Sequence, residues 1–144
     1  MKKIFLIIFI ALLFCGCSKE IDKFYLDDEY YNDGKFIDVE ALDELENKKY
    51  ILYTNNNVCN FPKPCTNIFE EFMSEYNIDI VTIYYEDFKN TKYYKEVENA
   101  PSIIIMNNGK IIDYLDINSE EDEIKYQSVD EFTKWISKYI YLTK

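Results

Sequence analysis

Strand-like and helix-like segments alternate along most of the chain, and this alternation is the feature that most constrains the fold. Runs of apolar, β-branched and aromatic residues at 50–54 and 78–85 predict strands. Apolar residues at helical spacing predict amphipathic helices at 64–76 and 128–139. Because strands joined through a helix pair in parallel by right-handed crossovers, the order of these segments indicates an α/β domain.

The remaining segments complete a sheet covered by helices. We expect a short helix capped by Asp38 with apolar residues on one face as far as Leu45, and a weaker helix or turn over 86–99. The segment 102–115 predicts a hairpin with an Asn-Gly turn of type I′. Residues 116–127 are expected to form an acidic loop. The fold class is therefore α/β, with a central mixed β-sheet flanked by helices.

The N-terminus has the pattern of an export signal. Lys2 and Lys3 precede an apolar run at 4–14, which is shorter than the ~20 residues that a membrane-spanning helix needs. The following Gly16-Cys17-Ser18 resembles a bacterial lipobox, in which Cys17 would receive diacylglycerol and a fatty acid such as palmitate. We therefore expect residues 1–16 to be a lipoprotein signal peptide.

Two alternatives to lipidation stay open, an ordinary secretory signal and an uncleaved anchor. All three place the domain outside the cytoplasm, and the lipobox favours a lipid-anchored protein on the extracytoplasmic face of the cell membrane. We interpret residues 17–34 as a tether and 35–144 as the domain. Such a tether would reach roughly 60 Å at ~3.5 Å per residue. Its scattered aromatic residues leave open that it packs on the domain instead.

Composition excludes several classes of function. The chain contains no His, which removes Ser-His-Asp and Cys-His catalysis and the commonest neutral metal ligand. Its formal charge is -11, whereas nucleic-acid binding needs a cationic surface. We therefore expect no nucleic-acid partner.

Four cysteines are present, and the leader accounts for two of them. If Cys15 is removed with the signal peptide and Cys17 is lipidated, Cys59 and Cys65 remain. In an oxidising compartment such a pair indicates a disulfide or a dithiol-disulfide couple. The spacing leaves three roles open: a redox couple, a structural disulfide and a metal clip. Two thiols are too few for the four ligands that zinc normally takes, so we expect no metal.

Several motifs in order resemble the thioredoxin fold family, over about residues 36–142. A strand with the sequence YILYT leads into the cysteine pair, and the second cysteine lies in PKPC at the start of a helix. The segment NAPSIIIMNNGKII resembles the family's proline, strand and hairpin, and a final helix follows. The pair here is an atypical C-x5-C. The resemblance implies that Pro101 is the family's cis-proline and that Ala100 offers its backbone to a substrate strand.

The resemblance implies an extracytoplasmic, membrane-anchored thiol-disulfide oxidoreductase that acts on thiols or disulfides of cell-envelope or secreted proteins, without an organic cofactor. By analogy Cys59 attacks and Cys65 resolves the mixed disulfide. A helix N-terminus also favours a thiolate, which keeps Cys65 as the other candidate for the attack. The alternative is a non-catalytic thioredoxin-fold lipoprotein that binds a partner, with Cys59-Cys65 as a structural disulfide.

Overall fold

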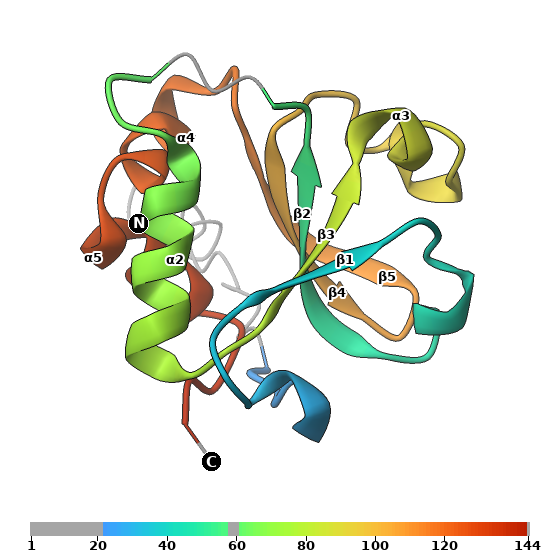
Figure 1. Ribbon diagram of the computed structural model, residues 1–144, viewed down its shortest axis with the longest axis horizontal. Helices are drawn as coiled ribbons and strands as arrows, with labels where there is room; N and C mark the ends of the chain where they lie inside the picture. Colours follow the sequence, from blue (N-terminus) through green and yellow to red (C-terminus); the bar gives the residue numbers. More distant parts are fainter. Residues whose placement is uncertain (1–21, 58–60, 144) are drawn as a thin grey trace, which may run out of the picture.

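The domain is built on a five-stranded mixed sheet with the strand order β1-β3-β2-β4-β5. A computed structural model describes residues 22–57 and 61–143 (Figure 1). Strands β1, β3 and β2 are parallel, whereas β4 runs antiparallel to β2 and β5 antiparallel to β4. The strands are β1 (Phe36–Val39), β2 (Lys49–Asn55), β3 (Ile80–Tyr84), β4 (Ser102–Asn107) and β5 (Lys110–Asp116). The predicted central mixed sheet is confirmed.

Helices lie on both faces of this sheet (Figure 1). One face carries α2 (Cys65–Tyr76), α4 (Glu120–Glu123) and α5 (Val129–Ile136). Rings join α2 to α5, with Phe72 and Phe132 at a centroid separation of 5.0 Å in an edge-to-face arrangement. Short elements lie on the other side, which are α3 (Tyr85–Phe88) and the 3-10 turns η2 (Asp43–Leu45) and η3 (Lys92–Lys95) (Figure 1).

The predicted hairpin is confirmed together with its turn. Asn107 pairs with Lys110, and the two residues between them, Asn108 and Gly109, have φ values of 49° and 71°. A type I′ turn needs positive φ at both central positions, which asparagine and glycine tolerate best. The helix predicted at 64–76 is also confirmed, although Pro64 is its N-cap and Cys65 its first residue.

The short helix predicted from Asp38 is wrong. Residues Phe36–Val39 form the edge strand β1, where Asp38 pairs with Thr82 of β3. Only Asp43–Leu45 makes a helical turn, of the 3-10 type. As a strand, residues 36–39 form backbone hydrogen bonds with the parallel strand β3. A short helix with a weak pattern would stabilise these residues less, so pairing with β3 overrides their helical preference.

The interpretation of residues 17–34 as a tether is corrected for its described part, residues 22–34. Leu26 and Tyr30 are buried in the core, with exposures of 2% and 3%. The Phe24 N–H donates to Tyr139 O at 2.9 Å, and the Tyr141 N–H donates to Phe24 O at 3.0 Å. This extension therefore packs on the domain, which was the alternative left open. Residues 17–21 lie outside the described residues.

The acidic loop predicted at 116–127 contains a short helix, α4, and the 3-10 turn η4 (Ile124–Tyr126). Tyr126 ends this segment and is fully buried, which anchors an otherwise acidic stretch to the core. Ser128 caps the last helix, because its Oγ accepts a hydrogen bond from the Glu131 N–H at 3.4 Å. Within 22–57 and 61–143, no helix is long and apolar enough to cross a membrane.

Candidate functional site

Three consecutive asparagines end β2 and begin the segment that leads to the cysteine pair. The Asn55 side chain accepts a hydrogen bond from the Asn57 N–H at 2.9 Å, which closes a tight turn. Asn57 has a φ of 58°, a conformation that asparagine tolerates better than most residues. Between them, Asn56 Nδ2 donates to Ala100 O at 2.7 Å. The run of asparagines therefore turns the chain and ties it to the loop before β4.

Cys65 is the first residue of α2 and has no exposed surface. It is disulfide-bonded, and its partner lies outside the described residues. The N-terminus of a helix has backbone N–H groups without intrahelical partners, and this environment favours a thiolate when such a bond is reduced. Because Cys65 is fully buried, a large substrate cannot reach its sulfur. A protein thiol or disulfide would therefore have to react at the sulfur of the cysteine bonded to Cys65.

The loop before β4 is held by side chains that bind four consecutive backbone carbonyls. The prediction of a cis bond between Ala100 and Pro101 is confirmed. The next residue, Ser102, pairs with Thr54 near the end of β2, which places this loop at the sheet edge where the cysteine segment begins. The four hydrogen bonds are Tyr85 Oη to Glu98 O, Ser102 Oγ to Asn99 O at 2.7 Å, Asn56 Nδ2 to Ala100 O at 2.7 Å and Tyr126 Oη to Pro101 O at 3.2 Å.

Tyr126 contacts both the spacer between the two cysteines and the loop before β4. Its ring lies against Phe61, with the centroids 5.8 Å apart, and Phe61 belongs to the spacer between the two cysteines. Its hydroxyl donates to Pro101 O at 3.2 Å and to Leu115 O at 2.8 Å. Burial raises the pKa of Tyr126 well above its ordinary value, so the hydroxyl stays a donor. The five-residue spacer thus places an aromatic anchor beside the candidate site.

The structure places three of the predicted site residues at the same end of the sheet. Cys65 follows β2, and Ala100 and Pro101 precede β4. Cys59 and the predicted lipidation site Cys17 lie outside the described residues.

Sequence reasoning missed Asn56 and Tyr126, the two residues that fix the Ala100 and Pro101 carbonyls. Runs of asparagine usually indicate a turn, and this signal was present around Asn56. The pattern did not indicate that Asn56 binds the Ala100 carbonyl. For Tyr126 the only signal was a large aromatic residue at the end of an acidic stretch. Neither pattern identifies a carbonyl acceptor that is distant along the chain.

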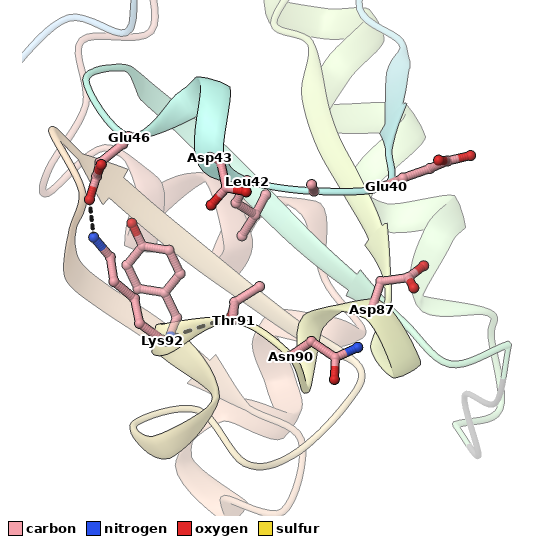
Figure 2. A pocket seen from close by; sticks show the side chains of 10 residues that line it. Glu40, Leu42, Asp43, Glu46, Asp87, Asn90, Thr91 and Lys92 are labelled. Carbon is pink, nitrogen blue, oxygen red and sulfur yellow. Dashed lines mark hydrogen bonds and ion pairs between the residues drawn. The ribbon is translucent and has the colours of Figure 1, made fainter.

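A separate acidic depression of about 330 Å³ lies between η2 and the α3–η3 segment (Figure 2). The carboxylates of Glu40, Asp43 and Asp87 line it, and Lys92 pairs with Glu46 at one side. The hydrogen bond and charge of Lys92 lower the pKa of Glu46. Among the residues that the structure describes, no group of three or more His, Cys, Asp or Glu side chains could hold a metal ion.

Two solved structures that are similar to this chain have the thioredoxin fold. Thioredoxin NaTrxh from Nicotiana alata superposes with a TM-score of 0.50 at 16% identity, covering 72% of this chain and 91% of that one. A proposed oxidoreductase with a thioredoxin fold gives a TM-score of 0.50 at 16% identity, covering 69% and 91%. No protein-family model and no curated protein matches the chain. The fold is therefore the thioredoxin fold, as the sequence resemblance predicted.

Proposed function

We propose that the protein is a thiol-disulfide oxidoreductase in which Cys59 and Cys65 form the redox couple. The observation that carries this proposal is the position of Cys65. It is disulfide-bonded, it is fully buried, and it is the first residue of the helix that follows β2. The loop with Ala100 and Pro101 lies at the same end of the sheet. A structural disulfide has no need of this position, whereas a redox couple gains a thiolate-stabilising helix terminus there.

Burial of Cys65 supports Cys59 as the attacking residue. In the reducing direction, the Cys59 thiolate attacks one sulfur of a substrate disulfide, and the other sulfur leaves as a thiolate that takes up a proton. The Cys65 thiolate then attacks the Cys59 sulfur of this mixed disulfide. The Cys59-Cys65 disulfide forms, and the second substrate thiol is released. The substrate gains two electrons, the protein loses two, and an external dithiol restores the reduced pair.

The substrate strand would lie along the loop before β4. An extended peptide can add to exposed backbone by hydrogen bonds to its N–H and C=O groups, and Ala100 is the residue that the resemblance assigns to this contact. Tyr126 and Asn56 would hold that loop in position. No organic cofactor and no metal takes part in the proposed chemistry.

The membrane link belongs to the same proposal. Cys17 would carry the lipid, on the extracytoplasmic face of the cell membrane, and the partners would be protein thiols or disulfides of the cell envelope. Because Phe24 already pairs with the C-terminal segment, at most residues 18–23 would separate this contact from the lipidated cysteine. At ~3.5 Å per residue they would span at most ~20 Å, not 60 Å.

The packed extension would also orient the domain relative to the membrane. The Asp27 N–H donates to Lys49 O at 3.0 Å, at the start of β2 and therefore at the end of the sheet opposite Asn55. The anchor would thus hold that end near the bilayer and turn the cysteine pair away from it. Replacement of Cys17 by Ser should release the protein from the membrane fraction, and retention of this variant in that fraction would contradict the proposed anchor.

Trapping tests the redox proposal. We expect the Cys65→Ser variant to accumulate mixed disulfides with cell-envelope proteins and with a model peptide disulfide, because the resolving thiol is gone. The Cys59→Ser variant is the matched control, and its remaining thiol is buried, so it should capture little. If neither variant captures a partner, the pair is a structural disulfide of a binding protein. Capture by Cys59→Ser alone would reverse the two roles.

A further inference from the structure

Two exposed tyrosine rings stack on each other where the N-terminal extension meets the C-terminal segment. Tyr25 is 45% exposed and Tyr141 is 43% exposed, and their ring centroids lie 4.6 Å apart at an interplanar angle of 27°. Lys23 Nζ lies 6.0 Å from the centroid of the Tyr141 ring. We call these three residues the aromatic patch. The stacked rings present a contiguous apolar surface to water, of the kind that interaction sites use.

Backbone hydrogen bonds hold the aromatic patch in place. Phe24 forms a parallel bridge with Ile140. The Phe24 N–H donates to Tyr139 O at 2.9 Å, and the Tyr141 N–H donates to Phe24 O at 3.0 Å. Paired backbone therefore presents the two rings, and a partner that contacts them has little chain left to order.

The aromatic patch lies close to the proposed lipid anchor along the chain. Residues 18–22 join Cys17 to Lys23, and at ~3.5 Å per residue this segment spans at most ~20 Å. In Figure 1 the C-terminus lies at the bottom of the domain, whereas the loop from β2 to α2 lies at the top. A lipid on Cys17 would therefore bring the bilayer to the end of the domain that carries the patch.

We propose that the aromatic patch docks in the headgroup region of the bilayer to which Cys17 is anchored. Tyrosine suits this region because its ring is apolar and its hydroxyl is polar, and it is enriched at membrane–water interfaces. The formal charge of -11 opposes attraction to anionic lipid, so the rings carry the contact and the Lys23 ammonium pairs with a lipid phosphate. This inference rests on the membrane link of the proposed function and is independent of the redox chemistry.

Docking gives the domain a second contact with the membrane and thereby a fixed orientation. A flexible tether alone leaves the domain free to turn about it. With the aromatic patch in the headgroup region, the loop from β2 to α2 faces away from the bilayer (Figure 1). The candidate redox site then faces proteins of the cell envelope and not the lipid.

The test measures how near each ring lies to the lipid. The full chain is produced in a bacterium that processes lipoproteins and is reconstituted into phosphatidylcholine vesicles that carry bromine near the headgroup. Tyr25→Trp and Tyr141→Trp each add one fluorophore, while the buried Trp135 gives the same background in every variant. We expect bromine to quench the added emission and its maximum to shift to the blue. The control is Tyr84→Trp, because Tyr84 is 56% exposed and pairs with the last residue of β2, at the opposite end of the sheet. Its emission should not change.

The outcomes separate the docking from the anchor. If the wild type does not sediment with the vesicles, the anchor fails and the docking fails with it. If it sediments and both patch variants are quenched no more than Tyr84→Trp, the anchor stands and the docking is overturned. A blue shift without quenching by bromine would place the rings against protein, such as a second copy of the chain, and would also overturn the docking.

A charge placed in the aromatic patch gives a second test. Tyr25→Asp in the Tyr141→Trp chain should reduce the quenching, because a carboxylate beside the ring is costly to bring out of water. Tyr84→Asp in the same chain adds the same charge at the opposite end of the sheet and should leave the quenching unchanged. Equal quenching in these two variants would contradict docking through the stacked pair.

Discussion

Replacing Tyr126 by Phe removes the hydroxyl that supports the loop before β4 and keeps the ring. That hydroxyl donates to Leu115 O at 2.8 Å and to Pro101 O at 3.2 Å, and the side chain is fully buried. A hydroxyl has one proton, so the two carbonyls share a single donor. The ring contact with Phe61 is preserved in the variant, which isolates the contribution of the hydrogen bond.

The expected cost follows from burial. Losing one net hydrogen bond costs ~1 kcal/mol, and leaving a buried carbonyl without its donor adds ~1 kcal/mol or more. We therefore expect Tyr126→Phe to lower the free energy of unfolding by ~2 kcal/mol. In a domain of this size, that corresponds to a fall in Tm of roughly 6–10 °C.

The measurement is urea denaturation followed by circular dichroism, with a thermal scan beside it. Tyr84→Phe is the control, because Tyr84 is 56% exposed and its replacement should change stability by less than ~0.5 kcal/mol. A Tyr126→Phe variant as stable as the Tyr84→Phe control would refute the assignment of Tyr126 as the anchor of the loop before β4.

Three further predictions concern the scaffold around the site. Asp113 Oδ2 accepts a hydrogen bond from Trp135 Nε1 at 2.7 Å, so Asp113→Ala should cost ~2 kcal/mol in urea denaturation and shift the emission of the chain's one Trp. Gly34 has a φ of 70°, and an added Cβ would lie 2.3 Å from Met73 O, so Gly34→Ala should cost at least ~2 kcal/mol by the same assay, unlike an alanine at an exposed turn. Burial raises the pKa of Tyr53 from 10.0 to about 12. Between these two values the folded state keeps a proton that the unfolded state releases. The contribution of neutral Tyr53 to the free energy of unfolding is therefore complete below pH 10 and declines as the pH rises towards 12. Tyrosinate absorbance should increase together with unfolding over this range.

Local signals account for the parts of the fold that the sequence predicted. The hairpin turn requires positive φ at two adjacent positions, and Asn108-Gly109 is the pair that accepts them most readily. Helix α2 could be predicted because its buried residues, such as Phe69 and Phe72, repeat at helical spacing. The position of Cys65 at its start followed from the proline before it.

Long-range contacts account for what the sequence did not predict. Strand β1 depends on pairing with β3, and its four residues show no alternation of buried and exposed side chains. The N-terminal extension is held by contacts with the far end of the chain, such as the stacked rings of Tyr25 and Tyr141 at 4.6 Å. The partners of the Tyr126 hydroxyl lie 11 and 25 residues away along the chain, beyond the reach of any local pattern.

The reduction potential of the Cys59-Cys65 couple tests the central proposal most directly. The full chain is equilibrated in thiol-disulfide buffers of graded potential, quenched with acid, and the free thiols are alkylated and counted by mass. A redox-active pair predicts a potential above about -300 mV, within reach of cellular dithiol partners. A potential below about -300 mV would identify a structural disulfide and contradict the proposed oxidoreductase.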